Sequence, residues 1–139
     1  MRNDFRAVFI ATGAHDEIKL KVDGENLQGV LPCVHFLKTV NLGGTVSLGT
    51  KVVVIGGGNA AVDAARTAQR LGSDVTILYR RSRREMPANT WEVSAAEEEG
   101  VKIEFLVAPR KIIGDTNVTG IECVRMKLGE PDASGRRRP

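Results

Sequence analysis

The sequence has few aromatic residues and few cysteines, and both shortages restrict what the protein can be. Aromatic residues make up 4% of its 139 residues, so we predict a core of Val, Ile, Leu and Ala. Its two cysteines, Cys33 and Cys123, lie far apart and form no C-x-x-C pair. We therefore expect two reduced thiols and neither a dithiol redox centre nor an iron–sulfur cluster held by this chain alone. Cys33 and His35 lack partners at zinc spacing, so no metal site is expected.

Long apolar runs are absent as well. No stretch is long enough to cross a bilayer, and no apolar signal region follows the first residues. We therefore predict a cytoplasmic protein with no membrane partner. The length favours one domain, and the formal net charge is +3. Much of the positive excess is local, at residues 80–84 and 136–138.

The most informative stretch runs from residue 51 to residue 72. Five residues, KVVVI, predict a strand buried on both faces, as in a parallel sheet. Gly56, Gly58 and Ala61 then follow the pattern G-x-G-x-x-G/A, and an alanine-rich helix runs on to a stop at Gly72. In this pattern the first glycine permits a tight turn, the second lets the backbone approach a pyrophosphate, and the small third residue lets the helix pack closely. The order strand, turn, helix and strand predicts a dinucleotide site.

The rest of the turn completes that site. Gly57 lies inside the turn, and Asn59 and Ala60 begin the helix. The free amides of a first helical turn face a bound anion, and the helix dipole favours its negative charge. We therefore predict that residues 56–61 bind the cofactor, with Asn59 contacting the nucleotide through its side-chain amide.

An arginine cluster identifies which nucleotide is expected. In this fold an acid at the end of the second strand, about 20 residues after the glycines, marks NAD, whereas arginine suits the 2′-phosphate of NADP. Here the second strand, residues 74–79, ends without an acid and is followed by arginines. We predict that Arg80, Arg81 and Arg84 bind the 2′-phosphate of NADPH. The alternative for these arginines is a solvated basic loop or a nucleic-acid patch.

The remaining elements are expected in the following order: a strand at residues 7–10, a helix after Pro32, a helix from Asn89 to Gly100, a strand at 101–107, and a hairpin formed by 111–113 and 118–128. Asn89 and Glu92 have the spacing of a capping box. The three glutamates at 97–99 are interpreted as a solvated face. The β-α-β-α-β order predicts an α/β fold: a Rossmann-like, doubly wound parallel sheet with helices on both faces and an appended antiparallel β-hairpin.

Several segments match a known family. They are residues 11–13 (ATG), 56–66 (GGGNAAVDAAR), 79–82 (YRRS), 85–88 (EMPA), 122–126 (ECVRM) and 129–137 (GEPDASGRR). Together they resemble the small (beta) subunit of NADPH-dependent glutamate synthase over nearly the whole chain. The combination is much more specific than the glycine motif alone.

The resemblance implies a flavoprotein with two nested dinucleotide domains, of the pyridine nucleotide oxidoreductase type. NADPH in the inner domain passes hydride to FAD in the outer one, and electrons continue through iron–sulfur clusters to a large subunit. By this resemblance residues 44–139 are an inner NADPH-binding domain, truncated at its C-terminus, and residues 1–43 are a crossover segment from the FAD domain. Gly13 marks the crossing point and is expected near the cofactor. No catalytic acid, base or nucleophile is expected in this chain.

The chain also departs from the family. The FAD glycine motif, the iron–sulfur cysteine clusters and the second crossing have no counterpart here. The expected partners are therefore the parent FAD domain and the glutamate synthase large subunit or another electron acceptor, and the chain alone is expected to be inactive. Two alternatives stay open: the same inner domain in a ferredoxin–NADP reductase or dihydropyrimidine dehydrogenase relative, and a basic interaction module. We also predict that residues 7–10 pair with the 51–55 strand, within one chain or by exchange in a dimer.

Overall fold

The computed structural model describes residues 18–139. The predicted strand at 7–10, its pairing with the 51–55 strand, and Gly13 lie outside the described residues. The described elements, in chain order, are α1 (Cys33–Asn41), β1 (Lys51–Ile55), α2 (Asn59–Arg70), β2 (Asp74–Tyr79), the 3₁₀ turn η1 (Arg83–Glu85), α3 (Thr90–Glu98), β3 (Lys102–Phe105), β4 (Val107–Gly114) and β5 (Val118–Arg125). The order agrees with the predicted one from the first helix onward.

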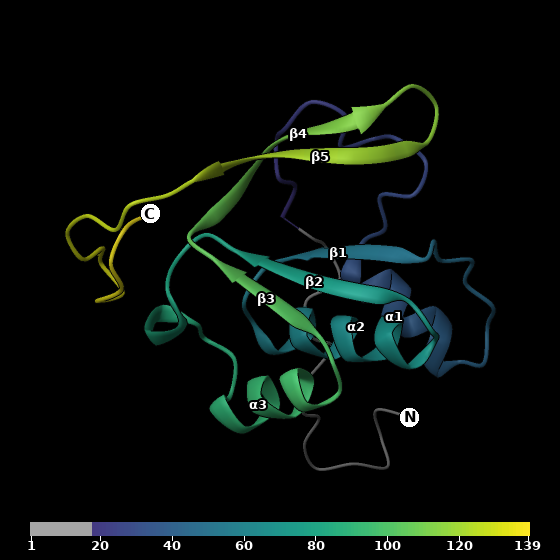
Figure 1. Ribbon diagram of the computed structural model, residues 1–139, viewed down its shortest axis with the longest axis horizontal. Helices are drawn as coiled ribbons and strands as arrows, with labels where there is room; N and C mark the ends of the chain where they lie inside the picture. Colours follow the sequence, from purple (N-terminus) through teal and green to yellow (C-terminus); the bar gives the residue numbers. More distant parts are fainter. Residues whose placement is uncertain (1–17) are drawn as a thin grey trace, which may run out of the picture.

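Three parallel strands form the central sheet in the order β1-β2-β3 (Figure 1). Lys51 of β1 lies opposite Asp74 of β2, and Thr76 of β2 lies opposite Lys102 of β3. Helices connect the strands, as parallel pairing requires. The predicted Rossmann-like α/β class is therefore confirmed.

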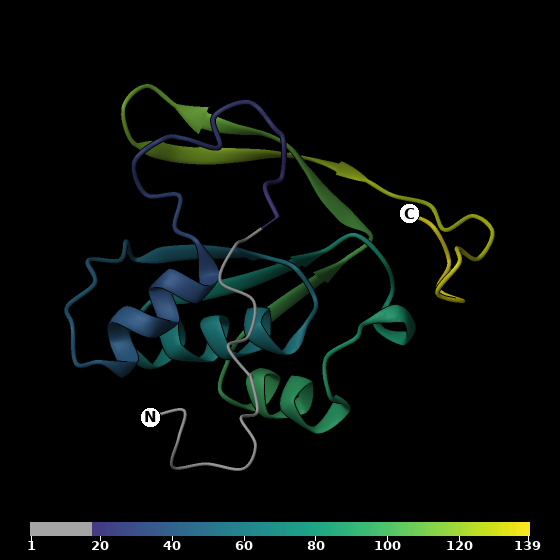
Figure 2. The same cartoon turned by 180° about the vertical axis from the view of Figure 1, so that it is seen from behind.

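The helices and the hairpin lie on opposite sides of this sheet. In Figures 1 and 2 the helices α1, α2 and α3 run along one side of the sheet, and β4 and β5 lie on the other. This differs from the predicted placement of helices on both faces. The amphipathic hairpin takes the position of a second helical layer, because its strand β4 packs on β2. The core between helices and sheet is aliphatic, as the shortage of aromatics predicted: Val62, Ala65, Val75, Ile77, Val93, Ala96 and Val101, with Phe36 from α1.

Strand β1 is less buried than its β-branched sequence suggested. Val52 and Val54 pack against the helical core, but Val53, on the opposite face, is 44% exposed. The reason is that β1 pairs only with β2 among the described residues, and the hairpin lies over β2. The prediction of burial on both faces was therefore wrong for the described part of the chain.

The chain changes direction sharply between β3 and β4. Leu106 has φ +58, a conformation that a leucine adopts only when its surroundings require it. Its amide donates to the carbonyl of Arg81, and its carbonyl accepts from the amide of Met126, so both backbone groups are fixed. The predicted single strand at 101–107 therefore ends at Phe105, and β4 begins at Val107 as part of the hairpin.

Residues 23–28 add a third segment beside the hairpin. Isolated bridges join Asp23 to Lys111 and Gln28 to Asn117. Gly24 has φ +81 and lies so close to β4 that an added Cβ would be 2.2 Å from the carbonyl oxygen of Ile112. The segment before α1 is thus packed against the C-terminal half of the chain.

The predicted helix starts lie close to the observed ones, but one predicted cap does not form. Pro32 is the N-cap of α1, one position earlier than its predicted place in the first turn. Asn89 is the N-cap of α3, but its side chain makes no capping hydrogen bond, so the predicted capping box with Glu92 is wrong. A capping box forms instead between Ser82 and Glu85 at η1. Among the described residues, no helix is long and apolar enough to cross a membrane.

Two of the three glutamates at the end of α3, Glu97 and Glu99, are ion-paired. Glu99 accepts hydrogen bonds from Arg66 (2.6 Å) and Arg70 (2.5 Å) of α2. These hydrogen bonds, the one from Arg66 first, lower the pKa of Glu99 to about 2. Glu97 pairs with Arg83 of η1. The interpretation as a solvated face is therefore corrected for Glu97 and Glu99, which join α3 to the loop after β2 and to α2.

Candidate dinucleotide-binding site

The glycine turn follows β1 directly and has the geometry that its motif requires. Gly56 has φ +141, a conformation that disfavours any side chain. An added Cβ there would be 3.3 Å from the Cβ of Ala61, so the turn and α2 are in close contact. The Gly56 amide donates to the carbonyl of Leu78 (3.1 Å), which continues the parallel ladder into the turn. The turn is thus held at the carboxyl end of the sheet.

Gly57 packs against the ring of Tyr79. An added Cβ would be 2.5 Å from two ring atoms, so no larger residue fits without movement. The Tyr79 hydroxyl donates to the carbonyl of Glu85 (2.7 Å), and the Gly57 carbonyl accepts from the Ala88 amide (3.0 Å). These contacts join the glycine turn to the segment after β2, which carries the arginines.

Gly58 is the open part of the turn. An added Cβ would meet nothing within 4 Å, so the surface above it is free for a ligand. Gly58 is the N-cap of α2, and its carbonyl accepts from the amides of Ala61 and Val62. Within residues 18–139 no protein acceptor bonds the amides of Asn59 and Ala60. An open approach over exposed helix amides is the arrangement that binds phosphate.

Side chains around the first turn of α2 secure its position. The Oδ1 atom of Asn59 accepts from the amide of Asn89 (3.0 Å), which links the start of α2 to the start of α3. The thiol of Cys33 in α1 donates to the carbonyl of Ala60 (3.1 Å). The contact of Asn59 with the nucleotide stays a prediction, and its side-chain oxygen is bonded within the protein.

Two of the four arginines after β2 have acidic partners inside the protein. Arg81 is buried, 6% exposed, and its Nη2 atom lies 2.6 Å from Oδ2 of Asp132. Arg83 pairs with Glu97 and lies over the ring of Phe105, 5.3 Å from its centroid. Arg81 is therefore held by Asp132 away from the open surface, and its predicted contact with the 2′-phosphate stays a prediction.

Arg80 and Arg84 are exposed, and neither forms an ion pair with any residue in the described range. Between them the backbone is ordered by Glu85, which accepts from the hydroxyl and the amide of Ser82. The Ser82 hydroxyl is the main cause of the lowered pKa of Glu85. The loop therefore presents two free guanidinium groups on a fixed backbone.

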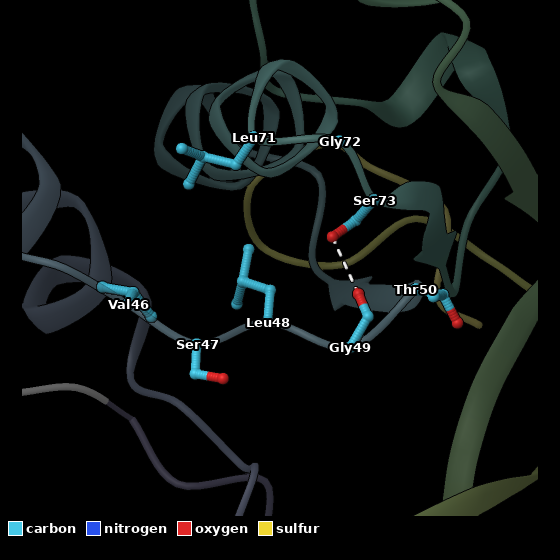
Figure 3. A pocket seen from close by; sticks show the side chains of 8 residues that line it. All are labelled: Val46, Ser47, Leu48, Gly49, Thr50, Leu71, Gly72 and Ser73. Carbon is cyan, nitrogen blue, oxygen red and sulfur yellow. Dashed lines mark hydrogen bonds between the residues drawn. The ribbon is translucent and has the colours of Figure 1, made fainter.

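A pocket at the opposite end of the sheet is not part of this site. Figure 3 shows it between the segment before β1 and the turn after α2, where the Ser73 hydroxyl donates to the Gly49 carbonyl (2.9 Å). Its volume is about 310 Å³. In parallel α/β sheets ligands bind outside the carboxyl ends of the strands, and this pocket lies beside the amino ends of β1 and β2.

Sequence reasoning missed two residues that shape the site. Tyr79 was treated only as the end of a strand, although its ring supports Gly57. Asp132 was considered only as part of the segment 129–137 that carries the family resemblance, and its partner Arg81 lies 51 positions earlier in the chain. No local pattern in the sequence specifies such a distant pair.

The parallel sheet, the glycine turn at its carboxyl end and the exposed first turn of α2 place the chain in the class of Rossmann-like domains. Residues 2–133 match the family described as pyridine nucleotide-disulphide oxidoreductase, and the chain belongs to that family.

Curated relatives align along the whole chain. The chain is 52% identical to the NADPH-Fe(3+) oxidoreductase subunit beta of Geobacter sulfurreducens and spans 22% of its length. It is also 52% identical to the NADP(+)-dependent formate dehydrogenase subunit beta of Moorella thermoacetica, spanning 20% of its length. With the glutamate synthase [NADPH] small chain of Azospirillum brasilense the identity is 41%, over 32% of that protein. The chain thus corresponds to less than a third of these proteins.

Solved structures show the same fold. Mycobacterium tuberculosis FprA in complex with NADPH superposes with a TM-score of 0.71 at 21% identity, over 92% of this chain and 44% of FprA. Lactococcus lactis thioredoxin reductase has a TM-score of 0.61 at 22% identity, over 88% of this chain and 38% of that protein. At this identity the likeness establishes the fold.

Proposed function

We propose that this chain binds NADPH and positions it for hydride transfer to FAD held outside the described residues. The observation that carries the proposal is the juxtaposition of an open glycine turn with Arg80 and Arg84, which form no ion pair with any acid of residues 18–139. Ile55 lies opposite Leu78 in the parallel register, so Gly56 follows β1 beside Tyr79, the last residue of β2. The exposed amides after Gly58 and the exposed Arg80 therefore follow neighbouring strand ends.

Each part of the site has a separate role in this proposal. The amides of Asn59 and Ala60 hold the pyrophosphate, and Gly58 leaves room for it. Arg80 and Arg84 bind the 2′-phosphate, for which the arginine fork is suited. NADPH supplies the hydride when it is bound, and the protein supplies orientation. Arg81 and Arg83 already have acidic partners, so only part of the positive charge of this loop is available to a nucleic acid.

Names of relatives support this cofactor choice. NADPH or NADP(+) appears in the names of the Geobacter, Moorella and Azospirillum proteins. We propose that residues 44–139 form the NADPH domain and that the preceding segment leads from an FAD domain. On this proposal the parent protein is an oxidoreductase whose iron–sulfur clusters, FAD and electron acceptor lie elsewhere.

The acceptor has more than one candidate. The sequence resembles the glutamate synthase small subunit, yet the identity is higher with the NADPH-Fe(3+) oxidoreductase and formate dehydrogenase subunits. We propose a small or beta subunit that serves an acceptor-specific partner. Comparing NADPH oxidation by the parent complex with ferric iron, with carbon dioxide, and with glutamine plus 2-oxoglutarate separates the three.

The binding proposal is tested by calorimetric titration of the full chain with NADPH and NADH. We expect clear preference for NADPH. Arg80→Ala and Arg84→Ala should each weaken NADPH binding by about tenfold or more, because one charged hydrogen bond contributes ~1.5–3 kcal/mol and ~1.4 kcal/mol is tenfold. NADH binding should stay unchanged, since NADH lacks the 2′-phosphate.

Arg83→Ala is the matched control. It removes the same charge from the same loop, but Arg83 is paired with Glu97 and lies over Phe105. NADPH preference should survive this change. Equal affinity for the two nucleotides in the wild-type chain, or an equal loss in all three variants, would contradict the assignment of Arg80 and Arg84.

A further inference from the structure

The C-terminal turn (residues 129–138) lies against the loop that carries the arginines (residues 80–85, here the arginine loop). Figures 1 and 2 show the turn and η1 at the same end of the molecule. An ion pair and a longer-range electrostatic effect connect them. Asp132 forms its ion pair with Arg81, and the positive charge of Arg137 contributes to the lowered pKa of Glu85, for which the hydrogen bond from Ser82 is the larger cause.

The C-terminal turn is itself well ordered around Asp132. One carboxylate oxygen, Oδ1, accepts from the amide of Ser134 (2.9 Å), from its hydroxyl (2.5 Å) and from the amide of Arg136 (3.3 Å). The other oxygen, Oδ2, accepts from Arg81. These hydrogen bonds, that of the Ser134 hydroxyl first, lower the pKa of Asp132 to about 2, so the carboxylate is charged at neutral pH. The C-terminal turn thus fixes one oxygen of Asp132, and the other oxygen fixes Arg81.

Arg81 is in turn fixed at both its side chain and its backbone. Its guanidinium is buried against Asp132, and its carbonyl accepts from the amide of Leu106 (3.1 Å). Arg81 directly follows Arg80 and stands three positions before Arg84. Holding Arg81 therefore fixes the backbone from which both free arginines project.

We propose that Asp132 is a positioning residue for the proposed NADPH site: by holding Arg81 it orients Arg80 and Arg84 toward the 2′-phosphate and so sets the preference for NADPH over NADH. The inference rests on the proposed function. It assigns Arg81 an indirect role, in place of the direct phosphate contact that its sequence position suggested. Preorganised cations bind an anion more tightly, because less side-chain and loop entropy is lost on binding.

In the alternative role, Asp132 competes with the 2′-phosphate for Arg81. If Arg81 left Asp132 to bind the phosphate, the carboxylate would oppose NADPH binding. The two roles predict opposite signs when the carboxylate is neutralised: a positioning Asp132 predicts weaker NADPH binding in Asp132→Asn, whereas a competing Asp132 predicts tighter binding. The burial of Arg81, with 7% of its side chain exposed, favours positioning.

The test uses Asp132→Asn, Asp132→Glu and Asp115→Asn in the full chain. Asp115 is exposed in the turn between β4 and β5, far along the hairpin from Asp132, and Asp115→Asn makes the same chemical change. NADPH and NADH affinities are measured by calorimetry, and thermal unfolding is followed for each variant. We expect Asp132→Asn to weaken NADPH binding by about tenfold with NADH binding unchanged, Asp132→Glu to restore part of the preference, and Asp115→Asn to match wild type.

Other outcomes overturn the inference in distinguishable ways. Unchanged or tighter NADPH binding in Asp132→Asn refutes positioning, while wild-type NADPH preference still upholds the proposed function. An equal loss of NADPH and NADH refutes a role in selectivity and indicates general damage to the site. If Asp132→Asn unfolds, Asp132→Glu tests the inference in its place. Its longer side chain keeps the charge, so it should change the ratio of NADPH to NADH affinity without unfolding the chain. Absence of NADPH binding in wild type removes both proposals.

Discussion

Replacing Gly57 by alanine separates the structural part of the glycine turn from its binding part. The added methyl group would lie 2.5 Å from two ring atoms of Tyr79, well inside van der Waals contact. The ring has little freedom to move, because it is buried and its hydroxyl is bonded to the Glu85 carbonyl. Overpacking of this kind costs ~1–3 kcal/mol. For a chain of 139 residues, each kcal/mol corresponds to roughly 4 °C in melting temperature, so Gly57→Ala should melt ~4–12 °C lower.

Gly58→Ala is the matched substitution one position later. Its methyl group would enter open space, and Gly58 has a φ of −89 that alanine adopts freely. Alanine is a weaker N-cap than glycine, which costs under ~1 kcal/mol of stability. The methyl group does, however, occupy the surface where the pyrophosphate is proposed to approach, so NADPH binding should weaken while the fold persists.

The assay is thermal unfolding by circular dichroism together with calorimetric titration of NADPH. Gly57→Ala should lose mainly stability, and Gly58→Ala mainly affinity. A Gly57→Ala variant with the melting temperature of wild type would show that the contact with Tyr79 does not exclude a larger side chain. A Gly58→Ala variant that binds NADPH with wild-type affinity would show that the pyrophosphate does not approach there.

Two further predictions concern neighbouring contacts. Asn59→Asp keeps the oxygen that accepts from Asn89 and puts a negative charge at the N-terminus of α2, where the helix dipole favours it, so stability should hold. The same charge repels the pyrophosphate, so NADPH binding, measured by calorimetry, should fall about tenfold. Unchanged binding would contradict the proposed position of the pyrophosphate. Glu99→Gln removes a carboxylate whose pKa is lowered to about 2 by Arg66 and Arg70. Since the folded pKa is the lower one, this stabilisation is complete above pH ~4.5 and disappears as the pH falls toward 2. Melting temperatures of wild type and variant should therefore differ at neutral pH and converge in acid; a constant difference would refute the ion pair as its source.

Elements defined by short-range patterns were predicted well. The β-branched strand, the glycine turn and the alanine-rich helix between residues 51 and 72 all appear as expected, because period and turn chemistry act over a few residues. The hairpin was also expected, and residues 115–117 join β4 to β5. Predicted boundaries were wrong where tertiary contacts bend the chain. One example is Leu106, whose positive φ divides the predicted strand at 101–107 in two.

Partners of individual charged side chains could not be predicted in this way. Four arginines with similar neighbours in the sequence receive different roles in the structure: Arg81 meets Asp132, Arg83 meets Glu97, and Arg80 and Arg84 stay exposed. The glutamates at the end of α3 looked solvated because the pattern within one helix does not show which neighbouring helix supplies an arginine. A distant contact also replaces the predicted capping box of Asn89 and Glu92, because the Asn89 amide bonds to Oδ1 of Asn59, 30 positions earlier in the chain.

By itself the sequence determined the α/β class, the position of the glycine turn and the family resemblance, since each depends on residues close together in the chain. Tertiary structure decided that the helices cover one face of the sheet and the hairpin lies on the other. It also decided which arginines remain free, because ion pairs such as Arg81 with Asp132 join residues far apart in the chain and form only when packing brings them together. The packing of Gly57 on Tyr79 is of the same kind: a local motif placed the glycine, and the parallel register of β1 and β2 supplied the ring beside it.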